Sequence, residues 1–270
     1  FIGINFAIFL LAALIDITIV GWSDSALKRI LFNRSKSTTG DIWCWVLSIF
    51  NLYDLFVLIF SFGFFYVLTS VMYSAIGQFN LIRLIDSAIV QIIIAFILSD
   101  LKHYLWHNFM HKRPFWELHK YHHSATELNL VTTARGHFVE KGFGTLFDAI
   151  LFLLFGLPIE YYVFIAFGKE FYSYLLHSDL NWSLGWVGKY ILMSPMAHKI
   201  HHSKSENHFD KNFGTFFVWW DKIFGTYLYT TEKIEIGVEN TTYNKLGFWR
   251  DMTLGLNEFL EASFSFKNKK

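Results

Sequence analysis

The sequence carries one five-residue pattern twice, as HKYHH at residues 119–123 and as HKIHH at residues 198–202. A third cluster, HYLWHNFMH, occupies residues 103–111, and all 12 histidines lie between His103 and His208. Residues three or four positions apart share one face of a helix, so each cluster can present two or three imidazoles to one place. A single match of this length carries a real risk of chance, whereas two copies beside a third cluster make chance a poor explanation. The spacing predicts a histidine-rich metal site.

The kind of metal site follows from what accompanies the histidines. Cys44 is the only cysteine, which excludes an intramolecular disulfide and any multi-cysteine zinc or iron–sulfur site. The sequence contains neither H-E-x-x-H nor E-x-x-H, which disfavours a zincin protease and a carboxylate-rich di-iron bundle. Haem is disfavoured because its histidine ligands would be isolated within apolar spans. The histidines outnumber the three or four that one zinc ion takes, so two adjacent, mostly imidazole-bound ions fit best.

The composition places this site in a membrane protein. The chain has 270 residues, of which 53% are hydrophobic, 20% aromatic and 17% charged, so it is more apolar and less charged than an average soluble domain. A net charge of +1 argues against a nucleic-acid binder that depends on phosphate contacts. The expected fold class is all-α: a polytopic integral membrane helical protein with a cytoplasmic, histidine-rich metal-binding cap.

The apolar segments predict where the chain crosses the membrane, since a spanning helix needs about 20 apolar residues. Spans are expected at Ile2–Val20, at Ile42–Ser70, which is long enough for a tilt or a kink, and at Leu81–Ser99. A further block, Thr145–Leu176, is interrupted by Gly156-Leu157-Pro158. We expect this block to form a hairpin that enters and leaves the membrane on one side.

Loop charge predicts the orientation. The loop Gly21–Asp41 carries several lysines and arginines, whereas Val71–Asn80 carries no charge, so the first loop is expected in the cytoplasm. The histidine clusters then also face the cytoplasm, at the bacterial inner membrane or the endoplasmic reticulum.

The whole chain, residues 1–270, is expected to form a single domain. Its expected parts are three spans (1–99), the first two histidine clusters (100–144), the membrane hairpin (145–176), the third cluster (177–230) and a polar tail (231–270). Within the tail, Phe248–Leu260 has the pattern of an amphipathic helix that lies against the protein or the bilayer surface.

The clusters resemble the histidine boxes of the fatty acid hydroxylase/sterol desaturase superfamily, which are membrane-bound, non-haem di-iron enzymes. The resemblance covers about Asp100–Tyr227. The first box of that superfamily, H-x-x-x-H, matches His107 and His111, and its second and third boxes match the two H-x-x-H-H patterns. One departure is Asn108, at a position where the family often has arginine.

The resemblance implies which histidines bind metal. His177 matches an additional histidine that family members place between the second and third boxes. His103 is extra to the usual first box and is a weaker candidate, as is His137; His208 lies beyond the third box and is expected at the surface. The implied ligands are His107, His111, His119, His122, His123, His177, His198, His201 and His202.

The resemblance also implies the chemistry. Two iron ions would be the cofactor, with zinc as a possible replacement in purified protein. The implied reaction uses O2 to oxidise an unactivated C–H bond of a sterol, a fatty acyl chain or a related lipid, and gives a hydroxyl group or a double bond. The chain contains no G-x-G-x-x-G fingerprint, so we expect an external electron donor such as a ferredoxin, a b-type cytochrome or a reductase.

Two further expectations concern the surroundings of the metal site. Carboxylates could accept the outer N–H groups of the imidazoles and so fix the ring orientations; the candidates are Asp100, Asp179, Asp210 and Asp221. The helices rich in phenylalanine and tryptophan are expected to form an apolar slot that opens sideways to lipid.

Two alternative functions use the same histidines. A zinc-dependent membrane hydrolase would need neither iron nor oxygen. A metal transporter would hold its ligands near the bilayer midplane, a depth for which the charged segments around these histidines are poorly suited.

Overall fold

The computed structural model describes residues 2–60, 63–76 and 80–265 of the chain. Within these ranges no β-strand is present, and isolated bridges join Leu192 to Phe217 and Ser203 to Ile236. The helices are α1 (Ile2–Val20), α2 (Ala26–Phe32), α3 (Lys36–Ile49), α4 (Leu52–Phe60), α5 (Phe64–Ile76), α6 (Ala88–Met110), α7 (Trp116–His123), α8 (Phe138–Phe155), α9 (Ile159–His177), α10 (Gly185–Tyr190), α11 (Pro195–His201), α12 (Trp219–Ile223) and α13 (Phe248–Phe264). Short 3₁₀ turns are η1 (Trp22–Asp24), η2 (Leu81–Leu84), η3 (Leu130–Ala134) and η4 (Glu206–His208).

The N-terminal helix has the bounds expected for the first span. A buried polar contact turns the chain at its end, because the Asp16 carboxylate accepts a 2.7 Å hydrogen bond from the Ala26 backbone N–H. Ser25 caps α2 by accepting from the Lys28 N–H. Helix α1 packs along α9 and thereby covers one side of the helices that lead to the histidines.

The expected span Ile42–Ser70 is not one continuous helix. Helix α3 ends at Ile49, α4 begins at Leu52, and the two are bent by 86° at the break between them. Asn51 stands at this break with a left-handed φ of 54°, a conformation that asparagine tolerates better than most residues. Residues 61–62, also part of the expected span, and residues 77–79 of the expected uncharged loop lie outside the described residues.

The bounds expected for the span Leu81–Ser99 are wrong at both ends. Its first residues form η2, and α6 starts at Ala88, where the Ser87 side chain caps the Val90 N–H. The helix continues past Asp100 to Met110 because this carboxylate is buried against donors from the 216–220 segment. The first histidine cluster is therefore part of the same helix as the apolar residues.

The break at Gly156-Leu157-Pro158 is present as expected and separates α8 from α9. Gly156 has φ of +62°, and a Cβ atom there would come within 2.5 Å of the Asn80 Cα, so both conformation and space favour glycine. Pro158 then precedes the first turn of α9. Helix α8 starts at Phe138, seven residues before the expected block.

Two helices in the described part of the chain, α1 and α6, are long and apolar enough to cross a membrane, and a third candidate arises if the bent pair α3–α4 is one span. Exposed large apolar side chains also occur along α4 and α5. The structure is thus all-helical, with two candidate spans.

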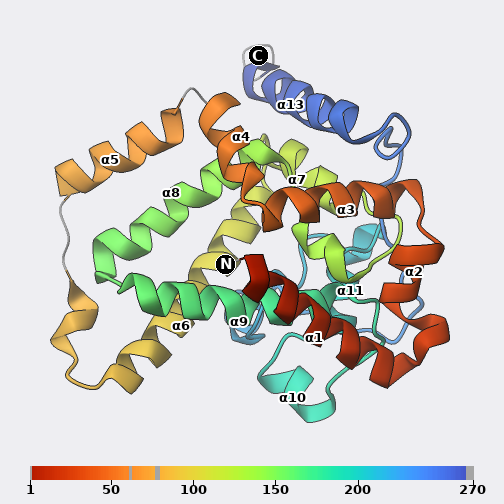
Figure 1. The fold of residues 1–270 in the computed structure, drawn as a ribbon, viewed down its shortest axis with the longest axis horizontal. Helices are drawn as coiled ribbons and strands as arrows, with labels where there is room; N and C mark the ends of the chain where they lie inside the picture. Colours follow the sequence, from red (N-terminus) through yellow and green to blue (C-terminus); the bar gives the residue numbers. More distant parts are fainter. Residues whose placement is uncertain (1, 61–62, 77–79, 266–270) are drawn as a thin grey trace.

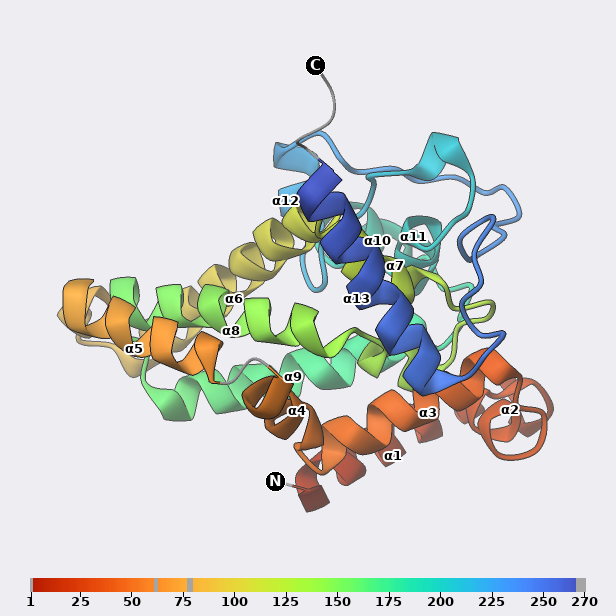
Figure 2. The ribbon, with the colours of Figure 1, turned by 90° about the horizontal axis from the view of Figure 1, so that it is seen from above.

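The helices α6, α8 and α9 bring the site together. Figures 1 and 2 show that the start of α6, the end of α8 and the start of α9 lie at the same side of the molecule as α5, and that these helices extend from there toward the segments that carry the histidines. Helix α13 packs across α7, the helix of the second histidine pattern (Figure 2). The expected amphipathic helix is thus present but longer, and residues 266–270 of the expected tail lie outside the described residues.

Candidate metal centre

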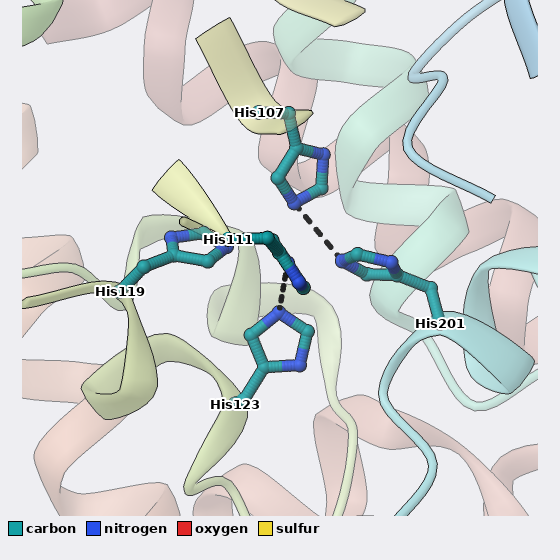
Figure 3. Close-up of side chains that lie close together, drawn as sticks. All are labelled: His107, His111, His119, His123 and His201. Carbon is teal, nitrogen blue, oxygen red and sulfur yellow. Dashed lines mark hydrogen bonds between the residues drawn. The ribbon is translucent and has the colours of Figure 1, made fainter. Parts of the chain in front are cut away.

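The nine strongest candidate ligands lie together in two adjacent groups. Within each group, the potential ligand atoms all lie within 4.8 Å of one another. The first histidine group, shown in Figure 3, consists of His107, His111, His119, His123 and His201. The second histidine group consists of His122, His177, His198 and His202.

Each H-x-x-H-H pattern contributes to both groups. On α7, the first and last histidines, His119 and His123, belong to the first group, whereas His122 belongs to the second. The order is reversed around α11, where the middle histidine, His201, belongs to the first group and its two neighbours in the pattern belong to the second. Each copy therefore has histidines in both groups. The two copies also meet within the first group, where the ring centroids of His123 and His201 lie 4.6 Å apart.

The Nε2 atoms inside each group are as close as ligands of one cation. His107 and His201 are 2.9 Å apart between Nε2 atoms, and His111 and His123 are 3.1 Å apart (Figure 3). In the second group, the Nε2 atom of His198 lies 3.0 Å from that of His177 and 3.3 Å from that of His202. Two imidazoles bound at right angles to a metal at about 2.1 Å would be separated by about 3.0 Å. The spacing fits shared metal ions.

Four of the nine rings are held at their outer nitrogen by a backbone carbonyl, whereas the Nδ1 atoms of His198 and His202 are buried with no hydrogen-bond partner among the described residues. Backbone carbonyls face the Nδ1 atoms of four histidines: His107 with Phe213 at 2.8 Å, His122 with Arg135 at 2.8 Å, His177 with Ser173 at 2.9 Å and His201 with Lys211 at 2.7 Å. A carbonyl oxygen only accepts, so Nδ1 carries the proton in these rings and Nε2 presents its lone pair to the group.

One carboxylate that the sequence does not predict adds a fifth outer partner. Glu140, in the first turn of α8, places Oε1 2.8 Å from the Nδ1 atom of His119. The Nε2 atom of His119 is buried and has no hydrogen-bond partner among the described residues, as expected of a lone pair reserved for a cation. No sequence signal distinguishes Glu140, because 21 residues and a helix break separate it from His119.

Three of the four carboxylates predicted to hold imidazoles do something else. Asp100 accepts the Phe216 and Phe217 N–H groups, and Asp221 accepts those of Phe213 and Gly214. Asp179 pairs with Lys199 at 2.6 Å. Only Asp210 approaches a ring, 3.4 Å from the Nδ1 atom of His111. Because Phe213 also accepts from His107, Asp221 supports that imidazole indirectly through the peptide backbone.

The remaining histidines lie outside both groups. His103, on α6, has its ring centroid 5.7 Å from that of His107. His137 is fully buried, with Nε2 2.8 Å from the Met252 carbonyl and Nδ1 accepting the Val139 N–H, so both its nitrogens are used. The prediction that His208 lies at the surface is wrong: it is 7% exposed, and Ser203, directly after the third cluster, lies 2.8 Å from its Nδ1 atom.

The fatty acid hydroxylase family model matches residues 92–226, half of the chain and the part that contains all nine grouped histidines. The chain belongs to this family. It is 32% identical to human alkylglycerol monooxygenase over 145 residues, which are 53% of this chain and 32% of the relative. It is 28% identical to the Rhizobium tropici ornithine lipid hydroxylase OlsE over 138 residues, which are 51% of this chain and 41% of the relative. It is 30% identical to human cholesterol 25-hydroxylase over 146 residues, which are 50% of each chain.

The matched segment covers only part of these relatives. It spans about a quarter of the Caenorhabditis elegans alkylglycerol monooxygenase and about a third of the zebrafish one. No solved structure matches the chain significantly.

Electrostatics keep the imidazoles of this family member neutral. Burial lowers the pKa of His201 to about 3, and burial together with neighbouring histidines lowers the pKa values of His122, His123, His198 and His202 well below the ordinary value. A neutral imidazole is the form that binds a metal. The site is therefore prepared for cations at neutral pH without a competing proton.

A buried ion pair supports the second histidine group from outside. Arg135, whose carbonyl faces His122, places Nη1 2.8 Å from the Asp41 carboxylate, and both side chains are inaccessible to solvent. Its Nε donates to the Tyr121 carbonyl on α7. Arg135 thus connects α3 to the helix of the second pattern.

Cavities reach the histidines from two sides. The central cavity, of about 420 Å³, contacts both groups and is lined by residues of α6, α8 and α9. The outer cavity, of about 480 Å³, touches His111, His123 and His201 and has Asp210 and Glu239 in its wall. The expected apolar slot is not what surrounds the groups, because the central cavity also contains Lys102, Lys141, Asp148 and Glu140.

Proposed function

We propose that this chain is an O2-dependent lipid hydroxylase whose nine grouped histidines hold two iron ions. The observation that carries the proposal is the pair of adjacent imidazole groups, in which Nε2 atoms converge while the outer nitrogens of five of the nine rings face a carbonyl or a carboxylate. Relatives named as monooxygenases and hydroxylases of lipids support hydroxylation over desaturation.

The donor set fits iron. Imidazole nitrogens suit iron, zinc and copper, and the groups contain no thiolate that would favour a softer metal. Zinc binds the same donors and can replace iron in purified protein, so zinc content alone does not exclude the proposal. Two bound iron ions would supply the oxygen activation that the oxidation of an unactivated C–H bond requires.

The residues of the chain have three tasks in this reaction. The imidazoles would keep the metals in place. The carbonyls that face His107, His122, His177 and His201 keep Nδ1 of these rings protonated, and the central cavity admits the lipid beside both groups. One oxygen atom of O2 enters the product and the other leaves as water, which consumes two electrons and two protons. These come from an external donor such as a ferredoxin, a b-type cytochrome or a reductase. The outer cavity, which touches His111, His123 and His201, offers this donor an approach to the first histidine group.

The membrane arrangement belongs to the same proposal. Helices α1 and α6 would span the bilayer, and the histidine groups at the end of α6 would face the cytoplasm. The basic loop that leads from α1 into α3 supports this orientation. The membrane would be the bacterial inner membrane or the endoplasmic reticulum.

Metal analysis and isotope labelling test the function together. The chain is expressed with iron in a host that grows under oxygen-18 gas, and the lipids of the host are then analysed. We expect about two iron ions per chain and lipid products heavier by one labelled oxygen, absent without O2. Turnover that continues without oxygen and iron would replace this proposal by the zinc-dependent hydrolase. One metal or none bound by iron-grown protein, with no labelled product, would also overturn it.

A further inference from the structure

A patch of exposed aromatic, aliphatic and basic side chains lies on α10 and α12. The two short helices are held side by side, because the Val218 N–H donates to the Ile191 carbonyl at 3.0 Å. The Trp219 indole N–H also donates to the Tyr190 carbonyl, at 3.1 Å. In Figure 1, α10 lies at the lower edge of the molecule. The aromatic–basic patch consists of Trp186, Lys189, Tyr190, Lys222, Ile223 and Phe224, all of which are exposed.

Large apolar groups dominate the aromatic–basic patch. Trp186 is 66% exposed and Ile223 is 67% exposed, and Phe224 follows Ile223 directly. The rings of Trp186 and Tyr190 lie one helical turn apart on α10, with 5.7 Å between their centroids. Apolar side chains that gather on one exposed surface mark a site of contact with another molecule or with a membrane.

The aromatic–basic patch is continuous with the candidate span α6. Phe96, in the apolar part of α6, lies 5.7 Å from Phe217 between ring centroids. About two turns farther along the helix, Tyr104 stacks on Phe224 of the patch at 5.1 Å. Asp100, the first charged residue of α6, lies between these two contacts. Figure 2 shows α12 beside the end of α6. The patch therefore lies where this helix changes from apolar to charged, which is the level of the lipid head groups if α6 crosses a bilayer.

Both charged side chains of the aromatic–basic patch are cations. The Lys222 Nζ atom lies 5.1 Å from the centroid of the Tyr190 ring, and the Lys189 Nζ atom lies 5.2 Å from the same centroid. The ion pairs among the described residues include neither lysine. Lysine beside tryptophan and tyrosine is the composition typical of the membrane–water interface.

The segments that form the patch expose no carboxylate. Within residues 180–205 and 211–231, all of which the structure describes, Asp221 is the only acidic residue. It is fully buried, and its carboxylate accepts from the Phe213 and Gly214 N–H groups. The surface of these segments thus combines positive charge with apolar side chains, which complements an anionic lipid surface.

We propose that the aromatic–basic patch binds the anionic head-group layer of the bilayer that α6 crosses. The aromatic rings and Ile223 lie among the lipids, and the ammonium groups of Lys189 and Lys222 bind lipid phosphates. The inference rests on the part of the proposed function that places α6 across the membrane. The third histidine cluster lies between α10 and α12 in the sequence, so this contact holds both flanks of the cluster against the bilayer.

Site-directed fluorescence on the full chain in lipid nanodiscs tests the contact. Cys44 is the only native cysteine and is buried, so an environment-sensitive maleimide dye labels an introduced cysteine, with the unaltered chain as background. At Ile223→Cys we expect blue-shifted emission that nitroxide-labelled lipids quench. The matched control is Phe209→Cys, because Phe209 is 54% exposed but lies beside Asp210 in the wall of the outer cavity. Its dye should remain in water. Equal quenching at the two positions would overturn the proposal, and a dye at Ile223→Cys that stays in water would leave the patch to a protein partner.

Lipid composition and lysine variants test the charge. All are measured on the Ile223→Cys chain, in nanodiscs of phosphatidylcholine with or without phosphatidylglycerol. The anionic lipid should raise the ratio of quenched to unquenched dye, and Lys189→Gln and Lys222→Gln should each remove about fivefold of this increase. Lys204→Gln is the matched control, because Lys204 is an exposed lysine whose charge is paired with Glu235 at 2.7 Å. Equal ratios in both lipids, or an equal loss in Lys204→Gln, would contradict binding of anionic head groups.

A label on α6 separates this failure from that of the proposed membrane arrangement. Ile93, in the apolar part of α6, is 53% exposed, so a dye at Ile93→Cys should be quenched by nitroxides deep in the bilayer. Quenching at Ile93→Cys without quenching at Ile223→Cys would disprove the contact of the patch and leave α6 as a span. Quenching at neither position would overturn the membrane arrangement itself. Metal content, measured on the same samples, reports on the histidine groups independently.

Discussion

The carboxylate of Glu140 lies 2.8 Å from the Nδ1 atom of His119 and joins the start of α8 to the helix of the second histidine pattern. It is the shortest carboxylate–imidazole contact around the nine grouped histidines in the described residues. Such partners orient a ligand ring and raise its basicity, and their loss typically weakens metal affinity 10–100-fold.

Glu140→Gln should therefore weaken metal binding at the first histidine group by about 10–100-fold while the protein still folds. Competition with a chelator of known affinity measures this change. Glu160→Gln is the matched control, because Glu160 occupies the first turn of α9 as Glu140 does that of α8. Equal affinities for Glu140→Gln and the wild-type protein would show that the contact does not act on the metal.

Much of this site was predictable from sequence because imidazoles four residues apart on a helix must converge. All nine favoured histidines are in the two groups, and His103 and His137 are outside them. Their distribution between groups was not predictable, since His107 and His201 meet only through the packing of α6 against the third cluster. The acceptors of Nδ1 were mostly mispredicted because backbone carbonyls serve this purpose, and any residue can supply one.

The helix boundaries expected from sequence were wrong for a related reason. Apolar composition predicts that a segment is buried or in lipid, but the ends of α6 depend on the tertiary partners of Asp100. The break before α4 depends on the backbone of Asn51, which hydropathy does not report. The hairpin break was predictable because glycine and proline act locally.

The crossed membership of His122 and His201 leads to a second prediction. Each is the middle histidine of its pattern and lies in the group to which the rest of that pattern does not belong. Removing either imidazole should lower metal content by about one ion per chain, at the second group for His122→Ala and at the first for His201→Ala. Elemental analysis of purified protein measures the loss.

His208→Ala is the control for these variants. It removes a buried hydrogen bond to Ser203 and should cost about 1 kcal/mol in the free energy of unfolding, but metal content should stay at the wild-type value. A similar metal loss in all three variants would mean that His208 supports the site or that the groups are not independent.

The buried pair Asp41–Arg135 predicts a large loss of stability. Asp41→Ala would leave the Arg135 guanidinium uncompensated in the interior and should lower the free energy of unfolding by about 3–5 kcal/mol. The Arg135 carbonyl faces His122, so metal affinity at the second histidine group should fall as well. Thermal unfolding in detergent and chelator competition measure the two effects.

The exposed pair Lys204–Glu235 serves as comparison for that variant. It has a similar separation of 2.7 Å but lies in solvent, so Glu235→Ala should not change the unfolding temperature measurably. If Asp41→Ala were as mild as Glu235→Ala, the buried pair would not be holding α3 against the histidine helices.

The pH dependence of stability should reveal the buried state of His137. Burial lowers the pKa of this imidazole to about 4, whereas an unfolded chain has an ordinary value of about 6.5. Between these values the unfolded protein binds a proton that the folded protein does not, so the free energy of unfolding falls as the pH decreases through this window. At about pH 5 this difference in proton binding lowers the free energy of unfolding of the wild-type protein by about 2 kcal/mol.

His137→Gln has no such proton, so its stability relative to the wild-type protein should rise by about this amount between about pH 7 and about pH 5. Chemical unfolding of metal-loaded protein at both pH values measures the difference in stability. The contributions of the ligand histidines cancel in this difference because both proteins contain them. A stability difference that stays constant with pH would show that His137 is protonated in the folded protein and that its Nδ1 atom does not accept from Val139.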